Sequence, residues 1–343
     1  MKKNSIKNSI KKKMLSAILV FGMAAGLAGC AGNPDVKKED GKQLDKITFV
    51  LDWTPNTNHT GLYVAQEKGY FEEAGLEVEI VQPPEDGAAV LVASGKAQFG
   101  VSFQDSMMPA LVGADALPIT AVAAILQHNT SGIVSRKGEG MDTPKGLEGK
   151  KYATRDKDLE KATIKKDMEK DAGDFGKVEL VPSTVTDEVS ALESKSVDAI
   201  WIFYGWAGIA AEVAGLETDY FAFKDINSDL DFYTPVIIGG AKWLEENPDT
   251  AKAFLSALEK GYEDAIENPQ EAAEILCKAS PELDKELVFA SQEYMKDQYK
   301  AEVDQWGYID PARWNAVYKW INENNRLEEE IPDNTGITNE YLE

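Results

Sequence analysis

The chain has 343 residues, a formal net charge of −23 at pH 7, two cysteines and two histidines. So acidic a chain excludes a broad basic surface for nucleic acid or for anionic lipid. Because the cysteines and histidines form no cluster with metal-ligand spacing, we expect no metal site. A chain of this length predicts two domains rather than a single hydrophobic core.

The N-terminal segment, residues 1–29, begins with lysines and no acidic residue and continues in an apolar run from Met14 to about Leu27. The run is shorter than the ~20 apolar residues that span a bilayer. A basic start followed by a short apolar run is typical of a cleaved signal peptide. Cleavage would remove six lysines, which takes the formal charge from −23 to −29.

The apolar run ends at Leu27-Ala28-Gly29-Cys30, which resembles the lipobox of bacterial lipoproteins. That resemblance implies a lipid on Cys30 that holds the chain on the extracytoplasmic face of the cell membrane, since each buried CH₂ of an acyl chain contributes ~0.8 kcal/mol. The alternative is a secretory signal with a chance cysteine. Residues 30–44 comprise this cysteine and a polar stretch with little to bury, so we expect a flexible tether there.

Residues 45–130 alternate between β-type and helical patterns. Strands are predicted at 47–53, 76–83, 98–104 and 118–126, and helices at 61–75, 86–97 and 106–114, the last interrupted by Pro109. This βαβα order predicts a mostly parallel sheet with helices on both of its faces.

A second series of the same kind begins near residue 131. Strands are predicted at 132–137, 151–155, 177–183, 197–204 and 220–226, with helices at 159–173 and 186–196. An apolar β-type stretch follows at 231–240, then helices at 241–267, 269–279, 285–299 and 310–324, and a polar extended end at 326–343.

The two series predict two α/β lobes. Because the apolar stretch near Ile237 lies far from the second series' own sheet, we expect the chain to return there to the first lobe. The first lobe would then comprise 45–130 plus 235–343, and the second 131–234. Two crossovers make a hinge, and ligands of open α/β sheets bind outside the carboxyl ends of the strands. We therefore expect a ligand cleft between the lobes.

One segment carries a specific resemblance. Trp53 to Ala65 reads W-x-P-N-x-N-H-x-G-x-Y-x-A, and with LVASGKAQFGVS and SVDAIWIFY it resembles the ThiY-like family of binding proteins that capture the pyrimidine precursor of thiamine. The resemblance covers roughly residues 46–325. It implies a two-lobed, type II periplasmic binding protein-like fold and a receptor role in an ABC importer, with hydroxymethylpyrimidine or formylaminopyrimidine as cargo for thiamine biosynthesis or salvage.

The same resemblance implies a monomer without a cofactor that works with separate permease and ATPase subunits. The chain has no G-x-x-x-x-G-K-[ST] phosphate loop, so ATP hydrolysis must reside elsewhere. Relatives with the more widely shared segments bind riboflavin, sulfonates, taurine or nitrate, and these cargoes remain alternatives.

The superfamily also includes a fungal enzyme that makes the thiamine pyrimidine from its own histidine and pyridoxal phosphate. Its clustered cysteines would fall near residues 233–235 and its histidine near 104–106, where this chain has neither. These departures, with the export signal, argue against synthesis, so we expect a binding protein and not an enzyme.

The candidate ligand contacts of the first lobe follow predicted strands. Trp53 offers a stacking face to a flat ring and Asp52 an acceptor for an exocyclic amine; the alternatives are a core position and an ion pair. Asn56, His59 and Tyr63 belong to the next helix start, where a cap, a structural histidine and core packing compete with ligand contact. Resemblance places Gln104 and Asp105 near the cleft, with an N-cap as the alternative.

The second lobe adds an aromatic cluster at WIFYGW. We expect Trp201 in the core and Tyr204 and Trp206 at the ligand, where they would face Trp53. The family tends to carry a carboxylate at about Phe203, and its absence bears on which pyrimidine is bound. Three further positions sit at the hinge or after strands: Tyr233 as a wall, His128 as hinge or contact, and Arg155 as a partner for an anionic tail or a surface ion pair.

Overall fold

The computed structural model describes residues 44–342 except 86, 184, 325 and 328. The predicted signal peptide, Cys30 and nearly all of the predicted tether therefore lie outside the described residues. Within the described part of the chain, no helix is both long and apolar enough to cross a membrane.

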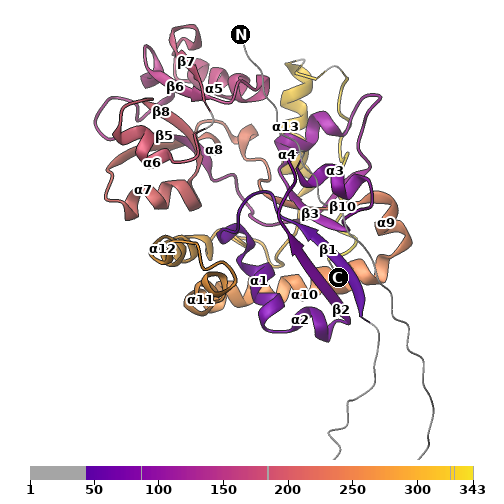
Figure 1. Cartoon of the computed structure of the whole chain (residues 1–343). Helices are drawn as coiled ribbons and strands as arrows, with labels where there is room; N and C mark the ends of the chain where they lie inside the picture. The colour runs from indigo at the N-terminus through magenta and orange to yellow at the C-terminus, as the bar shows by residue number, and fades with distance from the viewer. Residues whose placement is uncertain (1–43, 86, 184, 325, 328, 343) are drawn as a thin grey trace, which may run out of the picture. The chain divides into compact units, whose positions relative to one another are not determined.

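The first sheet has the order β2-β1-β3-β10-β4 (Figure 1). Its strands are β1 (Asp45–Val50), β2 (Leu76–Val81), β3 (Phe99–Ser102), β4 (Ile119–Ala124) and β10 (Val236–Gly240). β1 pairs in parallel with β2 and β3, whereas β10 is antiparallel to both β3 and β4. A strand from late in the chain thus lies between two strands of the first series.

The second sheet has the order β7-β6-β8-β5-β9. Its strands are β5 (Ser131–Arg136), β6 (Lys151–Thr154), β7 (Glu179–Pro182), β8 (Ala199–Phe203) and β9 (Thr218–Ala222). β5 is antiparallel to β8 and β9, and the other pairings are parallel. Each sheet is therefore mixed, and its one antiparallel strand is the strand that directly follows a crossover between the sheets.

Helices flank both sheets. In the first series these are α1 (Thr60–Glu67), α2 (Tyr70–Glu73), α3 (Ala88–Ala93) and α4 (Gln104–Met107); in the second, α5 (Asp158–Lys170), α6 (Glu188–Glu193), α7 (Ile209–Val213) and α8 (Phe223–Ile226). The C-terminal part adds α9 (Ala241–Glu246), α10 (Pro248–Glu267), α11 (Pro269–Ala279), α12 (Lys285–Met295) and α13 (Pro311–Glu323). The predicted helix at 61–75 is split because Gly69 adopts a φ of +79°, a left-handed conformation that suits glycine.

One face of β1 shows how alternation builds the core. Ile47 and Phe49 point into the cluster beneath the sheet, where Phe99 stacks on Phe254 of α10 with ring centroids 4.3 Å apart. α1 lies close against α10 because both carry glycine at the contact: a Cβ on Gly61 would stand 2.3 Å from the Tyr262 ring. This packing fixes α1, and with it the loop that leaves β1.

The C-terminal segment lies along the outer edge of the first sheet. Ala121 of β4 donates its N–H to Gly336 O and accepts from Thr338 N, so residues 336–338 continue the sheet beyond β4. The segment thereby covers an edge that would otherwise expose unpaired backbone groups.

Candidate functional site

The loop after β1 presents a histidine–carboxylate pair. The Asn56 backbone N–H donates to His59 Nδ1 at 3.2 Å, and His59 Nε2 lies 2.6 Å from Asp52 Oδ1. Because a backbone N–H can only donate, Nδ1 is unprotonated and Nε2 carries the proton that Asp52 accepts. His59 is buried, so it orients the Asp52 carboxylate and does not itself face the cleft.

The neighbours of this pair divide into exposed and structural residues. The Trp53 side chain is 61% exposed and belongs to no core cluster. Asn56 is the N-cap of η1 (Thr57–His59), and its Oδ1 accepts from Asn58 N at 2.9 Å. Asn56 is thus already engaged as a cap, whereas the Trp53 ring remains accessible.

Two of the predicted contacts, Gln104 and Tyr233, take part in a structural link. Gln104, the first residue of α4, is fully buried; its Oε1 accepts from Tyr233 N at 3.0 Å and its Nε2 donates to Trp314 O at 2.8 Å. Tyr233 is also fully buried, and its hydroxyl accepts from Asp310 N at 2.8 Å. Both side chains therefore join the second crossover to the first turns of α13.

Asp105 differs from its neighbour Gln104. Asp105 is half-buried. Burial raises the pKa of its carboxyl, while a hydrogen bond from the Ser106 backbone N–H and the positive charge of Arg155 lower it by less. Arg155 follows β6 in the second sheet and is itself exposed. Asp105 of the first lobe therefore interacts electrostatically with Arg155 of the second lobe.

Aromatic rings meet across the two lobes. Phe103 follows β3 and Phe203 ends β8, and their rings stack with centroids 5.9 Å apart and an interplanar angle of 16°. Both rings are half-buried. Neither phenylalanine was predicted as a ligand contact, because a phenylalanine at the end of an apolar strand is indistinguishable by pattern from a core residue.

The residues after β8 form η5 (Tyr204–Gly208), a π-helix, which is a conformation frequent at functional sites. The Tyr204 ring packs on Tyr220 and on Tyr294 of α12, and its hydroxyl donates to Glu212. Burial first, and then the Glu212 hydrogen bond, raises the pKa of Tyr204. Tyr204 is therefore held within an aromatic cluster.

Trp206 packs against a small core cluster of α1, α11 and α12 that contains Tyr63 and Cys277, both buried. Trp206 also lines a cavity between the lobes. Phe103, Phe203 and Trp206 supply its aromatic walls; the other lining residues are Thr57, Asn58, Leu126, Thr130, Gly205, Pro235 and Met295. The cavity measures about 20 Å³, room for roughly one water molecule.

A hydrogen-bond chain links Thr57 and Gly205, which line this cavity from the two lobes. Ser291 of α12 donates its hydroxyl proton to Gly205 O of η5, and its oxygen lies 2.6 Å from Thr57 Oγ1. Since the single Ser291 proton is used on Gly205, Thr57 must donate to Ser291. The structure thus shows the two lobes in contact around the aromatic walls, so a ring-sized ligand requires them to separate.

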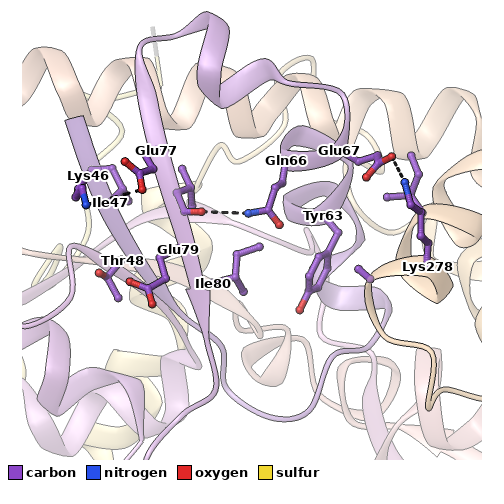
Figure 2. A pocket seen from close by; sticks show the side chains of 13 residues that line it. Lys46, Ile47, Thr48, Tyr63, Gln66, Glu67, Glu77, Glu79, Ile80 and Lys278 are labelled. Carbon is purple, nitrogen blue, oxygen red and sulfur yellow. Dashed lines mark hydrogen bonds and ion pairs between the residues drawn. The ribbon is translucent and has the colours of Figure 1, made fainter. Parts of the chain in front are cut away.

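A larger groove, of about 1030 Å³, lies along β2 on the first lobe (Figure 2). Figure 2 shows several of its polar side chains engaged with neighbours: Glu67 pairs with Lys278, and Gln66 Nε2 donates to Val78 O at 3.1 Å. Of the predicted ligand contacts, only Tyr63 lines it. No three His, Cys, Asp or Glu side chains among the described residues are grouped so as to hold a metal ion.

Comparison with known proteins adds a family and a fold. A family described as NMT1/THI5 like matches residues 56–272. The formylaminopyrimidine-binding protein of Halalkalibacterium halodurans is 27% identical over 322 residues, covering 89% of this chain and 92% of the relative. The 4-amino-5-hydroxymethyl-2-methylpyrimidine phosphate synthase THI13 of Saccharomyces cerevisiae is 26% identical, covering 87% of this chain and 88% of the enzyme.

Solved structures confirm the predicted two-lobed α/β fold. The periplasmic aliphatic sulphonate binding protein SsuA from Escherichia coli superposes with a TM-score of 0.65 at 16% identity, covering 87% of this chain and 99% of that protein. The desulfurization enzyme DSZB superposes with a TM-score of 0.59 at 14% identity, covering 87% and 97%. Because the fold serves both binding proteins and an enzyme, function has to be argued from the site.

Proposed function

Because this chain belongs to the NMT1/THI5-like family, we propose that it is the substrate-binding protein of an ABC importer, with a thiamine pyrimidine precursor as its cargo. The cargo is a pyrimidine of the hydroxymethylpyrimidine or formylaminopyrimidine type. The formylaminopyrimidine-binding relative, which aligns over most of both chains, supports this assignment. The fold shared with a periplasmic binding protein supports the receptor role.

The observation that carries the proposal is the facing pair of Phe103 and Phe203. A flat ring inserted between two parallel rings needs ~3.5 Å on each side, so Phe103 and Phe203, which now stack on each other, must move apart to admit one heteroaromatic ring. Offset-stacked aromatic pairs contribute ~1 kcal/mol beyond the area they bury. The collapsed pair thus marks the position that the cargo ring would occupy.

Two carboxylates follow neighbouring strands of the first sheet. Asp52 follows β1 and Asp105 follows β3, and β1 and β3 are adjacent and parallel. An aminopyrimidine carries an exocyclic amine that donates hydrogen bonds, and a carboxylate accepts them. We propose Asp52, Trp53, Phe103, Asp105, Phe203 and Trp206 as ligand contacts, with His59 positioning Asp52 and with Asn56, Tyr63, Gln104, Tyr204 and Tyr233 in supporting roles.

The family also contains synthases, so binding and synthesis have to be separated. A synthase that consumes its own histidine needs that histidine at the cleft. The chain has two histidines: His59 is buried against Asp52, and His128 is paired with Asp231 and Glu302. This arrangement supports reversible binding. Incubation with pyridoxal phosphate should give no absorbance band of an aldimine with a lysine, and a stable band would contradict the proposal.

The lobe boundaries complete the account. We propose that residues 45–130 and 235–343 form one lobe and residues 131–234 the other. The order of the two sheets supports this division, because β10 pairs only with β3 and β4 whereas β5 to β9 pair among themselves. The crossovers at 125–130 and 231–235 then serve as the hinge of lobe closure.

The anchor belongs to the same mechanism. A lipid on Cys30 would confine the receptor to the membrane surface, where the permease is, and so raise its local concentration without any further contact. Intact mass measurement of the chain from bacterial membranes should show cleavage before Cys30 and added acyl mass. A Cys30→Ser variant should be released from the membrane fraction; retention of this variant would contradict the anchor.

A thermal-shift panel tests the cargo. Hydroxymethylpyrimidine and formylaminopyrimidine should raise the melting temperature, because ligand at ~100 times its Kd adds ~2.7 kcal/mol to the free energy of unfolding. Thiamine, riboflavin, taurine and aliphatic sulfonates should shift it less. If only sulfonates or only riboflavin stabilise the chain, the pyrimidine assignment is wrong and the receptor carries another cargo.

A further inference from the structure

The two crossover segments are tied to each other by buried hydrogen bonds. Asn129 Nδ2 donates to Leu230 O at 2.7 Å, and Asn129 N donates to Asp231 Oδ1 at 2.9 Å. Asn129 Oδ1 in turn accepts from Ser131 N and Ser131 Oγ at the start of β5. Because both ends of the Asn129 side-chain amide are used, the two segments are expected to move together as one double-stranded hinge.

His128, the residue before Asn129, faces two carboxylates. Its Nδ1 lies 2.7 Å from Asp231 Oδ2 and its Nε2 lies 2.8 Å from Glu302 Oε2. An ionised carboxylate only accepts hydrogen bonds, so both ring nitrogens must donate and the ring must be an imidazolium. A neutral imidazole has one N–H and can satisfy only one of the two carboxylates.

Glu302 connects this histidine to the C-terminal part of the first lobe. Arg313 of α13 donates from Nη2 to Glu302 Oε1 at 2.9 Å and from Nη1 to Gln127 O, and its Nε lies 4.0 Å from Asp231 Oδ2. The charged groups that face His128 are therefore Asp231 from the second crossover, Glu302 and Arg313. Two cations and two anions alternate, so the loss of one charge unbalances the group.

We propose that His128 is a protonation-dependent pin of the hinge: as an imidazolium it fastens both crossovers to Glu302 and holds the lobes in the contact seen here, and on losing its proton it releases one carboxylate and favours opening. Because a ring-sized ligand requires the lobes to separate, cargo affinity then rises as the pH rises, a consequence that rests on the proposed function. The pin itself is a property of the ligand-free chain.

The electrostatics of the group give the pH range. The Asp231 hydrogen bond, above all, raises the pKa of His128 from its usual 6.5, against a smaller opposing effect of burial. Burial would raise the pKa of Glu302, but the His128 and Arg313 hydrogen bonds outweigh it and lower that pKa to about 2. Since the pKa of His128 is raised in the folded state, its stabilisation is complete below pH 6.5 and is lost as the pH rises through the raised pKa.

The first test follows the histidine directly. The chain has only two histidines, so NMR titration of the ligand-free full chain gives two sets of imidazole signals, and His128→Gln identifies one set. That set should titrate above pH 6.5, and Glu302→Gln, which keeps an acceptor but removes its charge, should lower its midpoint. A midpoint at or below 6.5, or one unchanged in Glu302→Gln, would overturn the proposal.

The second test follows the hinge. Hydrogen exchange of peptides spanning 125–131 and 230–236, compared at equal pH, should be faster in His128→Gln than in the wild type at pH 6, with the difference vanishing at pH 9. The control is Glu323→Gln, the same change in an exposed pair with Lys319 on α13, which should match the wild type throughout. Equal exchange in His128→Gln and wild type at pH 6 would contradict the pin.

The third test concerns the cargo. The Kd for hydroxymethylpyrimidine should fall by about fivefold or more between pH 6 and pH 9 in the wild type, the scale of a typical coupling between sites, and should stay flat in His128→Gln. Absence of pyrimidine binding at any pH would refute the proposed function. The first two tests would still show whether His128 acts as the pin. Binding with the same pH dependence in the wild type and in His128→Gln would refute the role of His128 but not the proposed function.

Discussion

Phe103 and Phe203 come from different lobes and stack on each other at the carboxyl ends of β3 and β8, with their ring planes 16° apart. Ligands of α/β sheets bind outside these strand ends. The cavity beside the pair is about 20 Å³, too small for a ring. The two rings therefore cover each other's faces, and the proposed ligand ring would have to separate them.

Replacing either ring tests this arrangement. Phe103→Leu and Phe203→Leu keep apolar volume but remove the aromatic face, so each should weaken pyrimidine binding by up to about tenfold, the worth of ~0.5–1.5 kcal/mol. Calorimetric titration provides the measurement. Phe175→Leu, a partly buried phenylalanine in η4 (Phe175–Lys177) of the second lobe, is the matched control and should bind normally. Full affinity in both cleft variants would refute stacking.

Asp52→Asn tests the acceptor for the exocyclic amine. The amide oxygen of the substituted side chain can still accept from His59 Nε2, so the fold should be retained, while the charge is lost. Hydrogen bonds to charged groups contribute ~1.5–3 kcal/mol, so the Kd should rise about 10- to 100-fold. Asp115→Asn, at an exposed site, is the control. If both variants bind alike, Asp52 does not contact the cargo.

Gln104→Leu should lower stability. The substitution leaves Tyr233 N–H and Trp314 C=O buried without their side-chain partner, and each such group costs ~1–3 kcal/mol. Urea denaturation should therefore show a lower midpoint with an unchanged slope. A variant as stable as the wild type but defective in binding would instead return Gln104 to the ligand contacts.

Asp167 on α5 predicts a pH effect away from the cleft. Both of its carboxylate oxygens are buried with no hydrogen-bond partner in the described part of the chain, and burial raises its pKa to about 7. The folded state thus holds a proton that the unfolded state releases near pH 4, so Asp167 lowers stability progressively as the pH rises from about 4 to 7. The full effect is on the order of 4 kcal/mol.

Asp167→Asn removes this titration. The variant should melt at a higher temperature than the wild type at pH 8 and at nearly the same temperature at pH 4. Thermal unfolding at the two pH values gives the comparison, with Asp115→Asn again as the exposed control. An unchanged melting temperature at pH 8 would show that the carboxyl of Asp167 is solvated.

Local pattern was sufficient for the α/β fold class because strand alternation and helical spacing are local properties. It indicated both βαβ series and the placement of Asp52 and Trp53 after a strand. It did not indicate the antiparallel strand of each lobe. That strand is β5 in one sheet and β10 in the other, and each directly follows a crossover between the sheets. Their direction depends on where the partner strand lies in space.

The site was less predictable for the same reason. Gln104 and Tyr233 lie 129 positions apart and exchange hydrogen bonds, a contact that no sequence window contains. Phe103 and Phe203 each resemble a core residue by pattern, and only the meeting of the lobes gives them a common role. The sequence leaves His59 open as a ligand contact or a structural histidine; its burial and its bond to Asp52 favour a positioning role.

Isothermal titration calorimetry of the wild-type chain with hydroxymethylpyrimidine and formylaminopyrimidine tests the central claim most directly. We predict saturable binding of one molecule per chain with a Kd of about 1 μM or tighter, corresponding to ~8 kcal/mol, and weaker binding in the Phe103→Leu, Phe203→Leu double variant. No heat with either pyrimidine, together with saturable heat from riboflavin, taurine or a sulfonate, would contradict it.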